Sequence, residues 1–284
     1  MHATPSRVDA HVHFWHPARL KYPWLAAVPA LNRPFLPEDY SLAARTAGIG
    51  KMVFVECGCV WPQSPDEVAW ITELAANEPR LHGIVAQAAV ELGTRINGTL
   101  AAFAQNPLVK GVRRNLQGEM DGRFCLQPDF ITGVRALANF DFTFDLCLNH
   151  HQLPAVIELV QRCPEVFFVL DHCAKPPIRA RQLDPWRQKL RELAGLPNVA
   201  CKISGLVTEA DPAHCGAEAL RPYVAHAVDC FGFDRVLFGT DWPLCELATP
   251  LENWLALLKT IFAGETEANL TKFFQTNAER IYRV

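Results

Sequence analysis

Two histidines near the start of the chain are spaced for joint binding of a metal ion. His11 and His13 lie in an apolar, β-rich run at 8–14, and residues two apart in a strand point to the same face. Two neutral imidazoles at this spacing can share one divalent cation such as zinc. The opposite face is predicted to carry Val8, Ala10, Val12 and Phe14. The alternative is a partly buried strand that happens to carry two histidines.

Seven further β-rich runs follow, at 52–57, 83–90, 109–113, 142–148, 166–173, 199–204 and 236–239. Most of these runs end in polar side chains that are costly to bury without partners. The residues at or just beyond these ends are Glu56, Arg113, Arg114, Asp145, His150, His151, Asp171, His172, Lys202, Ser204 and Asp241. Such a residue at nearly every strand end indicates a common site.

Helical patterns separate these runs, which predicts a parallel sheet because parallel neighbours need a crossover connection. Helices are expected at 37–47, 94–105, 128–139, 153–162, 184–193, 217–231, 249–262 and 267–282, with another that begins at Ser64. For that helix, Ser64 and Glu67 are predicted to form a capping box. Eight strand–helix units predict a (β/α)8 barrel, a single domain over 1–284, whose active site lies at the carboxyl ends of the strands.

Composition excludes several classes of function. The 284-residue chain has a net charge of −3, which gives no electrostatic signature for nucleic acid or anionic membrane. Its apolar runs are too short to span a bilayer, and residues 1–7 do not resemble a signal peptide. A cytoplasmic protein is therefore expected. The oligomeric state, monomer or homo-oligomer, stays open.

The ten cysteines are expected to be mostly small buried side chains and not a disulfide framework. Cys57 and Cys59 lack the spacing of a structural zinc site.

Seven segments together carry a resemblance to a known family. They are VDAHVHFW at 8–15, YPWL at 22–25, KGVRR at 110–114, LDHCAKP at 170–176, KISGL at 202–206, FGTDWP at 238–243 and NAERIY at 277–282. With them the chain resembles the amidohydrolase superfamily of the amidohydrolase 2 type, and within it the fuconolactonase-like sugar lactonases. The resemblance covers nearly the whole chain.

The resemblance implies that His11, His13 and Asp241 surround a metal ion or a bound water, with His172 beside them. Binuclear members bridge two ions with a lysine or glutamate on strand four. Strand four here ends in Arg113 and Arg114, which cannot coordinate a cation. At most one divalent metal, zinc, is therefore expected, and the resemblance also includes lactonases that need none.

Roles for the individual residues follow from this site. Asp241 is expected to act as the general base for water and later to return the proton to the departing ring oxygen, with His172 or a cation stabilising the oxyanion. A bound zinc would lower the pKa of that water. Predicted substrate contacts are Arg113, Lys202, Trp24 and His151. Lys202 could instead form an internal ion pair. Trp24 could instead close the loop over the mouth of the barrel. Asp145 is predicted to be a structural acceptor, while Glu56 and His150 stay open.

The function expected is hydrolysis of a sugar-acid lactone of the L-fuconolactone or L-rhamnonolactone type. Three alternatives remain, namely a lactonase for a dicarboxylate ring, a metal-dependent decarboxylase, and a barrel that has lost turnover. The dicarboxylate ring, such as a pyrone dicarboxylate or muconolactone, would need several cations aimed at the substrate. Loop residues are expected to recognise the stereochemistry of the sugar.

Overall fold

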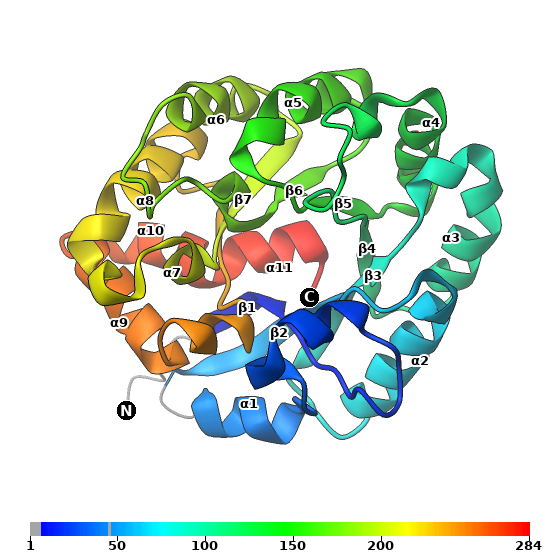
Figure 1. Cartoon of the computed structure of the whole chain (residues 1–284), viewed down its shortest axis with the longest axis horizontal. Coiled ribbons are helices and arrows are strands. Elements are labelled where there is room, and N and C mark those ends of the chain that lie inside the picture. The colour runs from blue at the N-terminus through cyan, green and yellow to red at the C-terminus, as the bar shows by residue number, and fades with distance from the viewer. Residues whose placement is uncertain (1–6, 45–46) are drawn as a thin grey trace.

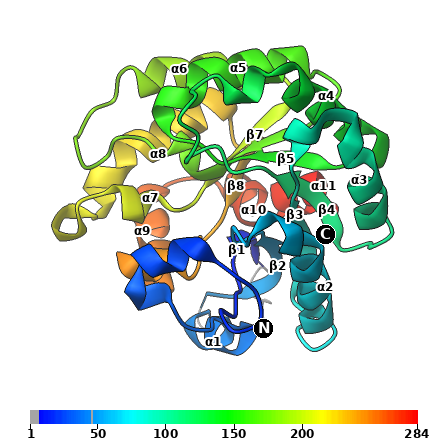
Figure 2. The same ribbon diagram turned by 45° about the vertical axis from the view of Figure 1, so that its right-hand side comes forward.

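The computed structural model describes residues 7–44 and 47–284. Its eight strands form one parallel sheet in sequence order, surrounded by helices (Figures 1 and 2). The strands are β1 Arg7–Val12, β2 Ile49–Val55, β3 Leu81–Gln87, β4 Val109–Arg113, β5 Thr143–Leu146, β6 Phe168–Leu170, β7 Val199–Ile203 and β8 Val236–Phe238. The predicted (β/α)8 barrel is confirmed. Two predictions fall partly outside the described residues. They are the absence of a signal peptide at 1–7, of which 1–6 are not described, and the helix at 37–47, of which 45–46 are not described.

The helices follow the predicted alternation closely. They are α1 Pro37–Ala43, α2 Ser64–Ala75, α3 Asn97–Ala104, α4 Pro128–Ala136, α5 Leu153–Arg162, α6 Trp186–Ala194, α7 Leu206–Glu209, α8 Ala217–Phe231, α9 Leu251–Ile261, α10 Glu267–Thr271 and α11 Asn277–Tyr282. Among the described residues, no helix is long and apolar enough to cross a membrane. All ten cysteines are described, and each is a free thiol, eight of them buried.

The first and last strands meet through a short seam. Val12 of β1 pairs with Trp242, just beyond β8. The His13 N–H donates to the Trp242 carbonyl at 2.8 Å, and the Asp241 N–H donates to the His11 carbonyl at 2.9 Å. The backbone bonds that close the barrel are therefore made by the same residues that were predicted to bind a metal.

The C-terminal helix α11 contributes to the interior of the barrel and crosses its middle in Figure 1. Ala278, Ile281 and Tyr282 pack against inward-facing strand residues such as Val53 and Val169. This apolar layer supports the polar side chains that lie closer to the carboxyl ends of the strands.

The predicted faces of β1 are only half right. Val12 and Phe14 pack with the outer core as predicted. Val8 and Ala10, however, pack inside the barrel with the other inward-facing residues. The register shifts between Asp9 and Val12, so the alternation of faces changes there and the side of the strand that carries Ala10 also carries His11.

Two local predictions were wrong. Ser64 does not cap α2, because its hydroxyl donates to the Gln87 carbonyl at 2.5 Å. The carboxylate of Glu67 accepts from the Tyr22 hydroxyl at 3.2 Å and does not reach back to the helix start. The run at 166–173 is strand only at Phe168–Leu170, since left-handed residues begin at His172.

Candidate active site

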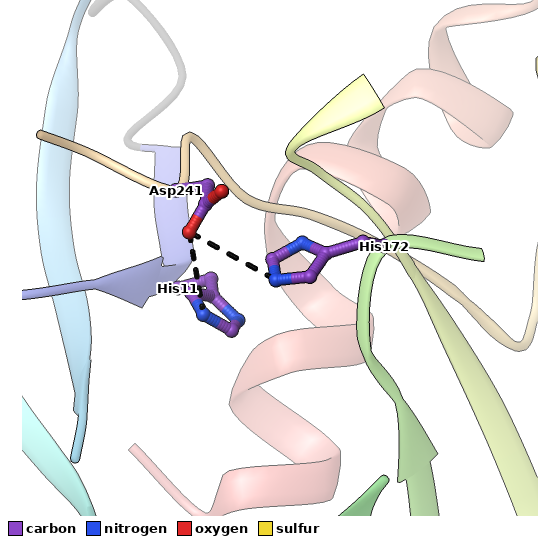
Figure 3. Close-up of side chains that lie close together, drawn as sticks. All are labelled: His11, His172 and Asp241. Atoms are coloured by element: carbon purple, nitrogen blue, oxygen red, sulfur yellow. Dashed lines mark ion pairs between the residues drawn. The ribbon is translucent and has the colours of Figure 1, made fainter. Parts of the chain in front are cut away.

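Three imidazoles and one carboxylate converge at the carboxyl end of the barrel. The Asp241 Oδ1 atom lies 3.4 Å from His13 Nε2, 3.7 Å from His11 Nε2 and 3.9 Å from His172 Nε2. Figure 3 shows the Asp241 oxygen directed toward the rings of His11 and His172. All four side chains are buried. The prediction that β1, β6 and β8 bring these residues together agrees with the geometry.

The second ring nitrogen of each histidine has its own partner. His13 Nδ1 lies 2.7 Å from the Val55 carbonyl, which can only accept, so Nδ1 carries a proton and donates it to this bond. His172 Nδ1 lies 2.8 Å from the Ser204 hydroxyl. His11 Nδ1 lies 3.3 Å from Asp171 Oδ1. These partners orient the rings so that all three Nε2 atoms face Asp241.

Burial keeps two of the imidazoles neutral. It lowers the pKa of His172 to about 4 and the pKa of His11 well below its ordinary value. Burial alone would raise the pKa of Asp241, but the attraction of the surrounding imidazoles, that of His172 first, outweighs it, and the net pKa is low. At neutral pH the site therefore holds an ionised carboxylate beside the uncharged imidazoles of His11 and His172.

The charges around this site are unbalanced. Asp241, Glu56, Asp145 and Asp171 are buried together with two cations, Arg113 and Lys202. Arg113 and Lys202 pair with Glu56, Asp145 and Asp171, whereas Asp241 has no lysine or arginine ion-pair partner among the described residues. Uncompensated charge is costly in such surroundings, so a divalent cation at this end of the barrel would balance the group.

The donor set fits a divalent cation. Asp241 Oδ1 is buried and has no hydrogen-bond partner among the described residues. The Nε2 atoms of His11 and His13 lie 3.1 Å apart, close enough for both to bind the same divalent cation. His11, His172 and Asp241 each offer a ligand atom within 4.8 Å of the others. Imidazole with carboxylate is a common ligand set for zinc.

A cavity of about 290 Å³ opens onto these residues. Besides His13, His172 and Asp241, it is lined by Trp15, Trp24, Glu56, Cys57, Gly58, Arg113, Asn115, Gln117, Cys147, Lys175 and Leu244. Its size and its mixture of aromatic and polar walls are typical of a small-molecule site. A larger hollow beside α8 contains none of these groups.

The comparisons with known proteins point the same way. The sequence profile of the Amidohydrolase family matches residues 8–284. The chain belongs to the amidohydrolase family. This amidohydrolase is 34% identical to the L-fucono-1,5-lactonase of Burkholderia multivorans, over 89% of the chain and 87% of the relative. It is 31% identical to the L-fucono-1,5-lactonase of Burkholderia ambifaria, over 98% and 96% of the two chains.

A solved structure adds a similarity in three dimensions. The crystal structure of an amidohydrolase from Burkholderia multivorans with bound zinc aligns with a TM-score of 0.89 at 31% identity. The alignment covers 98% of this amidohydrolase and 99% of that chain. The similarity therefore includes the whole barrel and the strand ends that form the site.

Arg113 lines the cavity, but its nitrogens are already engaged. Its Nε donates to Glu56 Oε1 and one terminal nitrogen to the Glu56 carbonyl, both at 2.7 Å. The other donates to Asp171 Oδ2 at 3.1 Å. In this amidohydrolase Arg113 thus offers a fixed positive charge at the cavity wall, and Glu56 acts as its anchor.

Lys202 does not reach the cavity. Its ammonium is completely buried and lies 2.6 Å from Asp145 Oδ2 and 3.0 Å from Asp171 Oδ1. Asp145 also accepts from the Tyr282 hydroxyl at 2.7 Å, in line with its predicted structural role. The geometry therefore corrects the prediction that Lys202 contacts substrate and favours the alternative of an internal ion pair.

The remaining predicted residues lie at different depths. Trp24 lines the cavity and its indole donates to the Cys57 carbonyl at 2.7 Å, so loop closure and substrate contact are both compatible with its position. His150 contacts the Lys175 carbonyl at 3.0 Å. His151 is exposed and does not line the cavity, and the geometry gives its predicted substrate contact no support.

An unusual turn after β6 shapes the site. His172, Cys173, Ala174 and Lys175 have φ angles between 48° and 59°, a left-handed conformation that is unfavourable for residues with a Cβ. Gly205 packs beside this turn, and a Cβ there would lie 2.7 Å from His172 Nδ1 and 2.8 Å from Asp241 Oδ2. Only glycine therefore lets these two side chains approach each other.

Among the charged and amide side chains of the cavity wall and its support, four had no predicted role in the site, namely Asn115, Gln117, Lys175 and Glu67. Asn115 and Gln117 follow β4, and Lys175 follows β6, by two to five residues. The prediction considered polar residues at or just beyond the strand ends and therefore missed these three. Glu67 lies beneath the cavity wall, where it contacts Tyr22 and the Cys57 N–H.

The stability of this amidohydrolase is expected to depend on pH through Glu67. Burial and the nearby charge of Glu56 raise the pKa of Glu67 from 4.5 to about 8. Between these values the unfolded state loses the proton that the folded state keeps, so this contribution to stability falls as the pH rises. Glu67→Gln, which cannot ionise, should therefore gain stability relative to the wild type from pH 5 to pH 8.

Thermal unfolding of both proteins at pH 5, 6.5 and 8 measures this difference. Glu73→Gln is the control, because Glu73 is exposed on the same helix. A difference in Tm that stays constant over this range would contradict the role given to Glu67.

Proposed function

We propose that this enzyme hydrolyses the lactone of a sugar acid, of the L-fuconolactone type, to the aldonic acid. The observation that carries the proposal is the ionised Asp241 carboxylate at the end of a small cavity with an indole wall. Indole faces and amide side chains suit a polyhydroxylated ring. Similarity to the two Burkholderia L-fucono-1,5-lactonases supports the same chemistry.

The charges of the cavity favour an uncharged lactone over a dicarboxylate ring. Arg113 and Lys175 are the cations that line the cavity in the described part of the chain. Arg113 is fully engaged by Glu56 and Asp171, and Lys175 lies 3.3 Å from Glu209. Two substrate carboxylates would therefore compete with existing ion pairs, whereas hydroxyl groups would not.

The proposed reaction uses one carboxylate twice. Asp241 takes a proton from water as the water oxygen bonds to the lactone carbonyl carbon. The carbonyl oxygen becomes an oxyanion, which His172 or a bound cation would stabilise. The bond from the carbonyl carbon to the ring oxygen then breaks, and Asp241 returns the proton to that oxygen as it becomes a hydroxyl group.

His11, His13, His172 and Asp241 are the residues that would hold a divalent metal, with zinc as the proposed ion. When bound, zinc supplies Lewis acidity, which lowers the pKa of water and polarises a carbonyl. Asp171, Val55 and Ser204 fix the orientation of the three imidazoles whichever ion is present.

Proton release from a panel of lactones tests the function, with and without a strong chelator. The panel contains L-fuconolactone, L-rhamnonolactone, a pyrone dicarboxylate and muconolactone, and elemental analysis follows the zinc content. Opening of the 6-deoxy-sugar lactones that stops with the chelator and returns with zinc is the expected result. If chelated protein that contains no zinc still opens these lactones, the lactonase function is supported and the proposed metal is not needed. If no lactone opens, the proposal is wrong, and carbon dioxide release would indicate the decarboxylase alternative.

A further inference from the structure

Lys175 occupies the last position of the left-handed turn that also presents His172. The turn places both side chains on the wall of the cavity that contains Asp241. Four successive left-handed residues are unfavourable in isolation, and such conformations concentrate at functional sites. An ordinary continuation of β6 would alternate these side chains between the two faces of the sheet.

The position of Lys175 is fixed at the backbone and at the side chain. Its N–H donates to the His172 carbonyl at 2.8 Å, and its carbonyl lies 3.0 Å from His150 Nδ1. Its ammonium lies 3.3 Å from Glu209 Oε1 on α7. His150, which had no assigned role, therefore helps to hold the backbone of Lys175.

The ammonium of Lys175 has unused donors. It carries three N–H groups, and Glu209 is its one ion-pair partner in the described part of the chain. The side chain is 21% exposed and lines the cavity, so a ligand in the cavity can reach these donors. Arg113 differs, because each of its nitrogens already donates to Glu56 or Asp171.

We propose that Lys175 is a specificity-determining residue that donates hydrogen bonds to ring hydroxyl oxygens of the lactone. Glu209 is its positioning residue. The inference rests on the proposed function and extends it to the part of the substrate that does not react. An ammonium largely neutralised by a carboxylate suits an uncharged polyol, since it offers donors without demanding an anionic ligand.

Lys175→Met tests the inference. Hydrogen bonds to charged groups are strong enough that the KM for the hydroxylated lactone should rise about tenfold or more. The change in kcat should be smaller, because Asp241 is untouched, and zinc binding should be unchanged. Lys175→Arg should recover part of the affinity. Lys189→Met is the matched control, since Lys189 forms a lysine–glutamate pair on the surface, 2.6 Å from Glu192.

Lactones that lack one ring hydroxyl sharpen the test. For the wild type, loss of the hydroxyl that Lys175 recognises should raise the KM. For Lys175→Met, the full lactone and this analogue should have the same high KM. If Lys175→Met does not fold, Glu209→Gln replaces it in the test. Because Glu209 only positions Lys175, the expected rise in KM is smaller. An unchanged KM in an active, folded variant would overturn the inference alone. A wild type that opens no sugar lactone would overturn the proposed function, and the inference with it.

Discussion

Asp241→Asn is expected to lose lactone hydrolysis by about 10²- to 10⁴-fold, the usual contribution of general acid–base catalysis. Asparagine has the same shape, but its amide cannot take a proton from water. The fold should be kept, because the backbone N–H of residue 241 still donates to the His11 carbonyl. Measurement of kcat/KM together with Tm separates the loss of chemistry from a loss of structure.

Asp229→Asn is the matched control for this substitution, because Asp229 is exposed on α8. Its kcat/KM should equal that of the wild type. If Asp241→Asn kept most of its turnover, Asp241 would have to be removed from the mechanism and the base sought elsewhere in the cavity.

Lys202→Met should have the largest effect on stability. The buried ammonium lies between Asp145 and Asp171, at 2.6 Å and 3.0 Å. Its removal leaves two buried carboxylates without their shared cation, which typically costs about 3–5 kcal/mol. Because Asp171 also lies beside His11 Nδ1, activity should fall as well. Denaturation in urea measures the free energy of unfolding.

Lys272→Met is the control for Lys202, since Lys272 pairs with an exposed carboxylate, Asp234, at 2.7 Å. Surface pairs contribute about 0–1 kcal/mol. The opposite pattern, in which Lys202→Met raises KM but leaves stability intact, would restore the prediction that Lys202 contacts the substrate.

The convergence of His11, His13, His172 and Asp241 could be predicted because the topology requires it. In a parallel barrel all carboxyl strand ends lie on one face, so polar residues at those ends approach one another whatever the loops do. The same rule could not separate Arg113 from Lys202. One lies at the cavity wall and the other deeper in the barrel, and depth depends on the stagger of the strands, which periodicity does not encode.

Local backbone events account for the other errors. The register shift in β1 turned Val8 and Ala10 inward, and strict alternation cannot anticipate such a shift. The left-handed turn that brings Lys175 to the cavity contains no glycine, which is the usual sequence signal for that conformation. Ser64 satisfied the pattern of a capping residue, yet the Gln87 carbonyl of a neighbouring strand provided a better partner.

The seam between β1 and β8 couples the site to the motions of the barrel. The amides of His13 and Asp241 make the hydrogen bonds that join the two strands, and the side chains of the same residues face each other across that joint. Any fluctuation that separates the strands also takes the site apart. A ligand held by both strands would stabilise the closed seam and slow the exchange of these two amides with deuterated water. The exchange rates of these two amides would then report whether a ligand occupies the site, without substrate turnover.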